Sequence, residues 1–298
     1  MLSHNVDFVA WRQTQQDAVE RALERWVRAD APAGLGDAMR YAVLDGGKRL
    51  RPLLVLATAE AVGGQSQAAM RAACAVELIH AYSLVHDDMP CMDNDVLRRG
   101  KPTVHVQFGQ AQALLAGDAL QALAFELLVP GDRTVADVMS ARLCRLLALS
   151  AGADGMAGGQ AVDLASVGVA LDLPSLEAMH RRKTGALLQA SVTMGAATGD
   201  VSRDTHASLA AFGACVGLAF QVVDDILDVT ADSTTLGKTA GKDAAADKPT
   251  FVSLMGLTEA QAYAERVLDQ AHDALRRSGL SHLHTLHALA DWVGRRAS

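Results

Sequence analysis

Long segments in which apolar residues recur at helical spacing cover most of this chain, and they constrain its fold more than any other feature. The chain is rich in alanine and leucine, only 4% of it is aromatic, and no stretch alternates like a strand, so helix is favoured over sheet. Helices are predicted at 8–28, 35–44, 67–85, 101–129, 134–151, 156–166, 174–198, 204–230, 258–277 and 281–296, with another opening near Pro52. No repeat, linker or shift in composition divides the series. We therefore predict one all-α domain over residues 1–298, a bundle of about ten or more helices.

Composition excludes several classes of function. The formal net charge of −7 argues against a general nucleic-acid binder, which would be basic. The start of the chain lacks the basic and then apolar layout of a signal peptide, and no run of about 18 residues is free of polar groups. We expect a cytoplasmic protein with no membrane span and no nucleic-acid partner. Four scattered cysteines without a CxxC pair predict free thiols: Cys74, Cys91, Cys144 and Cys215.

The apolar segment 67–85 runs into "HDDMPCMDND", a dense group of like charges. Asp87, Asp88 and Asp93 form the pattern DDxxxxD. On a continuous helix Asp87 and Asp93 would lie on different faces. Pro90 disfavours helix at the residue before it, so we expect the chain to turn there and bring Asp93 back towards Asp87. Acidic side chains at a helix C-terminus oppose the helix dipole, so they are poorly explained as stabilising groups.

A second acidic group, "DDILD", interrupts another apolar segment and supplies Asp224, Asp225 and Asp228. Asp224 and Asp228 are four residues apart and would share one face of a helix. Magnesium takes oxygen ligands and is commonly shared with substrate phosphates, so two such groups indicate a magnesium site. For either group alone, a solvated helix end is the competing interpretation.

Basic segments accompany the acidic ones. "GGKRLRP" places Lys48, Arg49 and Arg51 around the start of a helix, where cations are unfavourable unless an anion is also bound. An exposed basic loop is the alternative. Further basic or polar groups occur at Arg98, Arg99, Lys183, Thr184, Lys238, Lys242 and Lys248. Acidic groups beside basic ones suggest a polyanion held through metal ions, and a diphosphate on an apolar tail would use both the charges and the apolar helices.

Three polar residues lie within apolar or small-residue surroundings. His80 is two helical turns before Asp87 on the same face, which favours a ligand contact over a buried structural histidine. Gln160 and Asp163, within "GGQAVDL", fit either a cavity wall or a structural hydrogen bond.

Together, these motifs resemble those of a known family, the trans-prenyltransferases or isoprenyl diphosphate synthases, and most closely those of the bacterial farnesyl diphosphate synthases. The resemblance rests on segments that appear in the family's order between residues 46 and 250. These segments are "GGKRLRP", "ELIHAYSLVHDDMPCMDNDVLRRGKPTVH", "GGQAVDL", "HRRKTGALL", "FQVVDDILD" and "TLGKTAGKDAAADKPT".

The resemblance implies a helical fold around a central cavity, usually in a homodimer, that condenses an allylic diphosphate head-to-tail with isopentenyl diphosphate. It implies about three magnesium ions per site, with manganese able to replace them. It assigns metal binding to Asp87, Asp93, Asp224 and Asp228, and catalytic roles to Asp87, Asp88, Asp93, Asp224, Lys183 and Lys238. It assigns isopentenyl diphosphate to Lys48, Arg51, His80 and Arg99. It assigns the allylic diphosphate to Arg98, Lys183, Thr184, Gln221, Lys238 and Lys248.

Product length is predicted from Tyr82 and Ser83. Tyr82 is five residues before Asp87, about 7.5 Å along a helix, so a chain growing back from the metal end would meet its ring after two or three isoprene units. Ser83 is small and leaves room until then. An aromatic residue at this position resembles the farnesyl type, while "PCMDND" also resembles geranylgeranyl synthases. The competing interpretation is that Val76 or Cys74 ends the cavity.

Other readings remain open at this stage. A class I terpene cyclase shares the acidic pattern but binds one diphosphate, which the "GGKRLRP" segment and His80 argue against. A regulatory subunit would typically lack intact acidic motifs. Asn94 and Val96 depart from residues that are often acidic in the family. The polar segment 235–250 is expected to order when a diphosphate binds, and Arg295 and Arg296 are left open as groups that help close the site.

Overall fold

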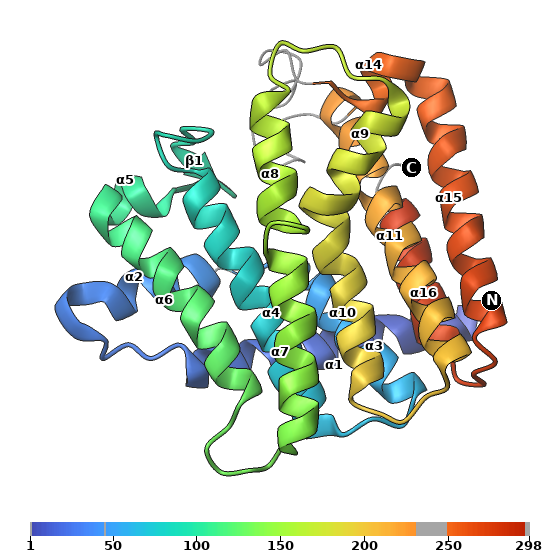
Figure 1. The fold of residues 1–298 in the computed structure, drawn as a ribbon, viewed down its shortest axis with the longest axis horizontal. Helices are drawn as coiled ribbons and strands as arrows, with labels where there is room; N and C mark the ends of the chain where they lie inside the picture. The colour runs from blue at the N-terminus through green and yellow to red at the C-terminus, as the bar shows by residue number, and fades with distance from the viewer. Residues whose placement is uncertain (1, 45, 231–248, 296–298) are drawn as a thin grey trace.

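The computed structural model describes residues 2–44, 46–230 and 249–295, with side chains from residue 7 onward. Within these ranges the chain is almost entirely helical, as the sequence predicts (Figure 1). The first half contains α1 (Leu2–Trp26), the short η1 (Pro32–Gly34), α2 (Leu35–Val43), α3 (Leu50–Ala61), α4 (Ser66–Asp87), α5 (Val104–Phe108), α6 (Gln110–Leu128) and α7 (Asp137–Ala151). The second half contains α8 (Met156–Ala165), α9 (Leu173–His180), the π-helical segment η2 (Arg181–Gly185), α10 (Ala186–Ala197), α11 (Arg203–Thr230), α14 (Phe251–Met255), α15 (Leu257–Arg277) and α16 (His284–Gly294).

The prediction of one helix over 101–129 is wrong. Leu97–Arg98 (β1) and Lys101–Pro102 (β2) form a small antiparallel hairpin, and two helices, α5 and α6, follow it. The break between these helices is Gly109, whose φ of 89° lies outside the helical region. The hairpin was not expected either, because two-residue strands carry no readable alternation.

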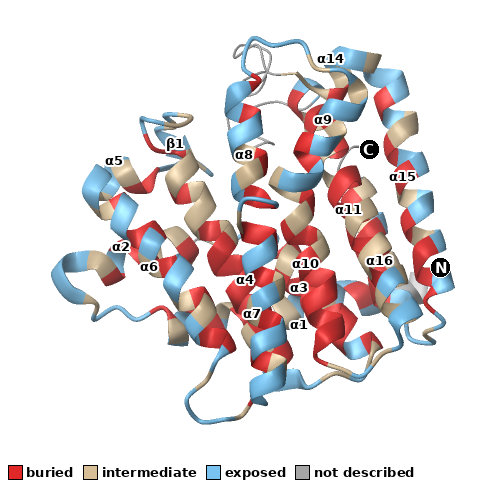
Figure 2. Ribbon diagram, in the orientation of Figure 1, coloured by how far each residue is buried: buried red, intermediate tan, exposed pale blue. Residues whose placement is uncertain are grey.

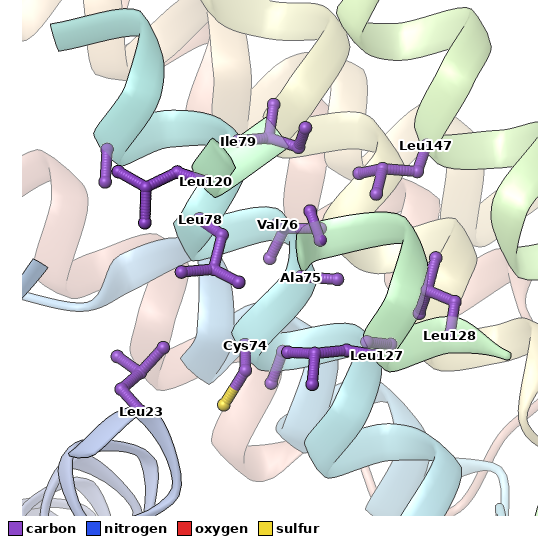
Figure 3. Packing of buried hydrophobic residues seen from close by; sticks show 14 of the residues in the cluster. Leu23, Cys74, Ala75, Val76, Leu78, Ile79, Leu120, Leu127, Leu128 and Leu147 are labelled. Atoms are coloured by element: carbon purple, nitrogen blue, oxygen red, sulfur yellow. The ribbon is translucent and has the colours of Figure 1, made fainter. Parts of the chain in front are cut away.

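Buried apolar residues line the facing sides of the helices, so red ribbon lies at the centre of the molecule in Figure 2. The largest cluster joins α4 with α1, α6 and α7. Figure 3 shows Leu78 and Val76 of α4 among Leu120 and Leu128 of α6 and Leu147 of α7. A second cluster joins α3, α10, α11 and α16, and a third joins α9, α11, α14 and α15. Helices α4 and α11 are therefore held by packing along most of their length.

By length and composition alone, α4, α6 and α11 are apolar enough to cross a membrane. In this structure 67% of the most apolar window of α4, 50% of that of α11 and 39% of that of α6 is buried inside the bundle. The absence of a membrane span therefore stays a prediction from the sequence.

The two acidic segments end at the same end of the bundle. The β1–β2 hairpin follows the first segment and α14 follows the second, and both lie at the top of Figure 1. The aspartates expected to bind metal ions thus lie near the ends of two long helices that are packed in the bundle.

Candidate active site

The first acidic segment forms a turn at the C-terminal end of α4. Helix α4 stops at Asp87, and the backbone N–H of Asp93 donates to the carbonyl oxygen of Asp87 at 2.9 Å. The N–H of Asp95 likewise donates to the carbonyl of Asp88 at 3.1 Å. Asn94 adopts a φ of 52°, which asparagine tolerates better than most residues. The turn predicted from Pro90 is confirmed, and it brings the first and last aspartates of DDxxxxD together.

Asp88 faces away from this pair and holds Arg98. Its carboxylate is buried and accepts hydrogen bonds from Nε of Arg98 at 2.9 and 3.1 Å and from Nη2 at 2.6 Å. The hairpin that carries Arg98 is thereby fixed to the end of α4. In this arrangement Asp88 orients a guanidinium group, and its predicted catalytic role stays a prediction.

The Asp87 carboxyl lies in a crowded electrostatic environment. Burial raises its pKa to about 6; Asp93 and Asp88 also raise this pKa, whereas Lys183 and Arg98 lower it. A bound cation would reduce the repulsion between the carboxylates that meet here. Among the described residues, no three metal-ligating side chains lie close enough to hold an ion by themselves. The carboxylates of Asp87 and Asp93 are donors that suit magnesium, which commonly uses one or two carboxylates and completes its shell with phosphate oxygens and water.

A cavity of about 410 Å³, here called the main cavity, opens beside Asp87 between α4, α8 and η2. It brings together seven of the residues predicted from sequence: Arg51, His80, Tyr82, Ser83, Asp87, Lys183 and Thr184. Met92, Met156, Ala157, Ala161 and Leu164 supply apolar lining. Charged groups and apolar surface thus share one cavity, as a prenyl diphosphate requires.

A second, smaller cavity of about 50 Å³ lies on the other side of α4, and His80 lines both. Arg98 and Arg99 line this smaller cavity and do not line the larger one. Nη1 of Arg99 donates to the carbonyl oxygen of Gly46 at 2.7 Å, which joins the hairpin to the "GGKRLRP" segment. The exposed Lys48 belongs to the same segment. Of the four residues predicted for isopentenyl diphosphate, Arg51, His80 and Arg99 thus lie around these two cavities, and Lys48 adjoins them in sequence.

Arg49 lines the smaller cavity with His80, Arg98 and Arg99, but its guanidinium is already paired with carboxylates. Its guanidinium is buried and bonds to Glu20 of α1 at 2.6 Å, to Glu77 of α4 at 2.6 Å and to the carbonyl oxygen of Val43 at 2.6 Å. Arg49 therefore fixes the basic segment to three helices. Glu77, in the middle of an apolar helix, is the signal that could have revealed this buried ion pair.

His80 is a neutral group among cations. Burial lowers its pKa well below the usual value, and Arg51, Arg99, Arg98 and Arg49 lower it further. Burial also lowers the pKa of Arg51, while Glu77 and Asp224 raise it. Asp224 of the second acidic segment therefore acts on the same arginine that lines the main cavity.

The π-helical segment η2 positions Lys183 and Thr184. A Cβ at Gly159 of α8 would lie 2.1 Å from the Lys183 backbone nitrogen, and a Cβ at Gly217 of α11 would lie 2.8 Å from the Cα of Gly185. Only glycine permits both close approaches. Nζ of Lys183 donates to the buried carboxylate of Asp163 at 2.5 Å. Of the two roles that the sequence left open, Gln160 forms part of the cavity wall and Asp163 makes a structural hydrogen bond.

A chain of hydrogen bonds connects η2 to the second acidic segment. Thr184 Oγ1 donates to Gln221 Oε1 at 3.0 Å, and Gln221 Nε2 donates to Asp225 at 2.9 Å. The other oxygen of Asp225 accepts the backbone N–H of Phe251 at 2.8 Å, at the start of α14. A polar cavity of about 80 Å³ lies beside these hydrogen bonds, and Lys183 lines both this cavity and the main cavity. Asp225 is thus a structural anchor, a role that the sequence did not reveal.

The remaining predicted residues fall into two groups. Asp228 is buried on α11, and Arg295 lines a groove with residues of α11, α15 and α16. Lys238, Lys242, Lys248, most of the 235–250 segment and Arg296 lie outside the described residues.

Tyr82 lines the main cavity, five residues before Asp87 on α4. Cys74 and Val76, the competing candidates for the end of the cavity, are fully buried within the largest apolar cluster and do not line it (Figure 3). Of the three candidates for the end of the cavity, only Tyr82 is thus in contact with it, and its role in product length stays a prediction.

Comparison with known proteins agrees with this geometry. Residues 32–282 match the family model described as polyprenyl synthetase. The chain is 50% identical over 279 residues to a probable farnesyl diphosphate synthase of Bradyrhizobium diazoefficiens, covering 90% of this chain and 82% of that protein. It is 48% identical over 297 residues to a chloroplastic heterodimeric geranylgeranyl pyrophosphate synthase large subunit of Arabidopsis thaliana, covering 97% of this chain and 80% of that protein.

A solved structure is similar over nearly the whole chain. It is a geranyltransferase from Helicobacter pylori complexed with magnesium and isoprenyl diphosphate, with a TM-score of 0.86 and 34% identity, covering 97% of this chain and 98% of that one. The helical architecture, the cavity beside the acidic end of α4 and the match over 32–282 lead to one conclusion. The chain belongs to the polyprenyl synthetase family of trans-prenyltransferases.

Proposed function

We propose that the protein condenses dimethylallyl and geranyl diphosphate head-to-tail with isopentenyl diphosphate and makes mainly farnesyl diphosphate. The observation that carries this proposal is Tyr82, which lines the cavity between the acidic end of α4 and the apolar core. Family membership supports the reaction, and the position of the tyrosine ring supports the product.

We assign the metal ions to Asp87 and Asp93 on one side of the site and to Asp224 and Asp228 on the other. These carboxylates would hold about three magnesium ions, and manganese would be accepted because it has the same preference for oxygen ligands. Magnesium bound there would neutralise the charge that develops on the diphosphate leaving group.

We assign the two substrates to two groups of basic and polar residues. Arg51, His80 and Arg99 line the cavities near the start of α3, which suits isopentenyl diphosphate, and the proposal adds the exposed Lys48 of the same segment. Lys183, Thr184 and Gln221 lie near η2 and suit the allylic diphosphate, and the proposal adds Arg98, Lys238 and Lys248 to them. Two separate cationic groups favour a synthase over a terpene cyclase, which binds one diphosphate.

The reaction needs no side-chain nucleophile. The allylic C–O bond breaks, the double bond of isopentenyl diphosphate attacks the allylic carbon, and a proton is then lost to the departed diphosphate. Lys183 balances charge on the leaving group, and Asp163 holds that ammonium in place. The apolar side chains of the cavity limit the access of water, which would otherwise react with the allylic cation.

Product length tests the proposal directly. Purified protein is incubated with magnesium, dimethylallyl diphosphate and labelled isopentenyl diphosphate, and the product chains are resolved by chromatography. We expect mainly fifteen-carbon product from the parent and longer product from Tyr82→Ala. A mainly twenty-carbon product from the parent would instead identify a geranylgeranyl synthase, the alternative suggested by "PCMDND". Unchanged fifteen-carbon product from Tyr82→Ala would show that another group ends the cavity.

We also propose that the protein is a cytoplasmic homodimer. All four cysteines are free thiols, which suits a reducing compartment. Large apolar residues are exposed along α5 and α6, namely Val106, Leu114 and Leu115, and such a face suits a protein–protein contact.

A further inference from the structure

The wall that carries Tyr82 is built from two pairs of residues on adjacent helices. Tyr82 and His86 are one turn apart on α4, and Gly117 and Gln121 are one turn apart on α6. Tyr82 and His86 both line the main cavity, whereas neither α6 residue lines it. Any effect of this wall on the product rests on the proposed role of Tyr82 in product length.

Gly117 lets the His86 ring lie directly on α6. A Cβ at position 117 would be 2.1 Å from Nε2 of His86 and 2.6 Å from its Cδ2, distances that real Cβ atoms do not adopt. Gly117 itself is buried. The same Nε2 lies 3.1 Å from the carbonyl oxygen of Leu114, so with its proton on Nε2 the ring donates to the α6 backbone. The position of the His86 ring therefore depends on the missing side chain at 117.

His86 in turn contacts Tyr82. Their rings meet edge to face, with centroids 5.7 Å apart and an interplanar angle of 75°. The Tyr82 hydroxyl shares a hydrogen bond with the side chain of Gln121, and burial raises the pKa of this phenol, so it stays neutral. The tyrosine ring is thus held at one edge by His86 and at its hydroxyl by Gln121.

We infer that Gly117 and Gln121 of α6 are specificity-determining positions, which set product length by holding His86 and Tyr82 at the cavity wall. Neither residue needs to touch the substrate. Each acts through one α4 side chain, and the two act in opposite directions.

Removing the polar group at 121 frees the tyrosine. Gln121→Leu keeps a similar volume but leaves the Tyr82 hydroxyl without this partner, so the ring can swing away from the growing chain. We expect the ratio of twenty-carbon to fifteen-carbon product to rise at least about threefold, a change typical of small alterations in an apolar pocket.

Adding a side chain at 117 has the reverse effect. Gly117→Ala forces the His86 ring off α6 and towards the cavity that it already lines. The space left for the chain becomes shorter, so ten-carbon geranyl product should accumulate relative to fifteen-carbon product. The effect should disappear in the double variant His86→Ala/Gly117→Ala, because the displaced ring is then absent.

The experiment compares product chains from these variants with those from the parent and Tyr82→Ala. Gln112→Leu is the matched glutamine control, because Gln112 also lies on α6 but donates to the carbonyl of Ala33 and does not line the cavity. Gly131→Ala is the glycine control, because a Cβ there would meet nothing within 4 Å. Thermal unfolding checks that each variant is folded. Gln121 is exposed, so its variant keeps the test valid if Gly117→Ala does not fold.

The expected result is longer product from Gln121→Leu, shorter product from Gly117→Ala, and parent-like product from both controls. If Tyr82→Ala lengthens the product while Gln121→Leu and folded Gly117→Ala behave like the parent, this inference is overturned and the proposed role of Tyr82 stands. If Tyr82→Ala leaves the product unchanged, the proposed product floor fails together with the inference.

Discussion

At the scale of single residues, His80 is the group whose charge responds most directly to a bound anion. Burial and four arginines keep its pKa well below the usual value in the free protein. A diphosphate near Arg51 and Arg99 would offset these cations, so the pKa of His80 should rise on binding.

A higher pKa in the complex means that binding takes up a proton. Affinity for isopentenyl diphosphate should therefore be greatest at low pH and fall as pH rises through the pKa of the bound state. Calorimetry in two buffers of different ionisation enthalpy measures the number of protons taken up. We expect uptake in the parent and none in His80→Gln; equal uptake in both proteins would assign it to another group.

The sequence predicted residue placement well where a local rule applied. Pro90 ends the helix, so the return of Asp93 to Asp87 followed from backbone sterics alone. The buried ion pairs of Arg49 were not predicted, because its partners Glu20 and Glu77 are 29 and 28 residues away in sequence. No local pattern distinguishes a guanidinium that faces a ligand from one that faces a buried carboxylate.

At the scale of elements, α8 and α11 pack closely against the π-helical segment η2 at glycine positions. Gly159→Ala would place a Cβ 2.1 Å from the Lys183 nitrogen, so either α8 or η2 must shift. Overpacking of this kind typically costs about 1–3 kcal/mol.

We therefore expect Gly159→Ala to lower the midpoint of thermal unfolding and to raise the KM for the allylic diphosphate more than that for isopentenyl diphosphate. Gly131→Ala is a suitable control, because it adds a Cβ in open space. An equal rise in both KM values would contradict the assignment of η2 to the allylic substrate.

Helix positions were predictable because the period of apolar residues is strong, but helix breaks were less so. Gly109 resembles the other small residues of its segment, and only its φ of 89° reveals the break between α5 and α6. The π-helical turn was not predictable either, because it arises from close contacts with α8 and α11.

At the scale of the whole molecule, the proposed homodimer would use the exposed apolar side chains of α5 and α6 as its contact. Replacing exposed Leu115 with glutamate should shift the protein from dimer towards monomer in analytical ultracentrifugation, because burying an unpaired carboxylate is costly. Val138→Glu, an exposed apolar position on α7, is the control. A parent that sediments as a monomer at all concentrations would overturn the proposed dimer.

The site itself depends on the whole fold. Its residues come from α3, α4, α8, η2 and α11, and sequence identified most of them through motifs rather than through contacts. What sequence could not supply was the hydrogen bonding that supports them: Asp88 with Arg98, Asp163 with Lys183, and Asp225 with the first residue of α14. The last two of these pairs join residues that are far apart in sequence and that the folded bundle brings together.

The central claim is that both acidic segments hold the metal ions that assist loss of diphosphate. The most direct measurement is the rate of chain extension by Asp87→Ala and Asp224→Ala at saturating magnesium, with circular dichroism to confirm folding and exposed Asp118→Asn as the matched control. We predict that each alanine variant turns over at least about 100-fold more slowly than the parent, comparable to losing one strong transition-state stabiliser, and that chelator abolishes activity. Full activity in either variant, or in the presence of chelator, would contradict the account.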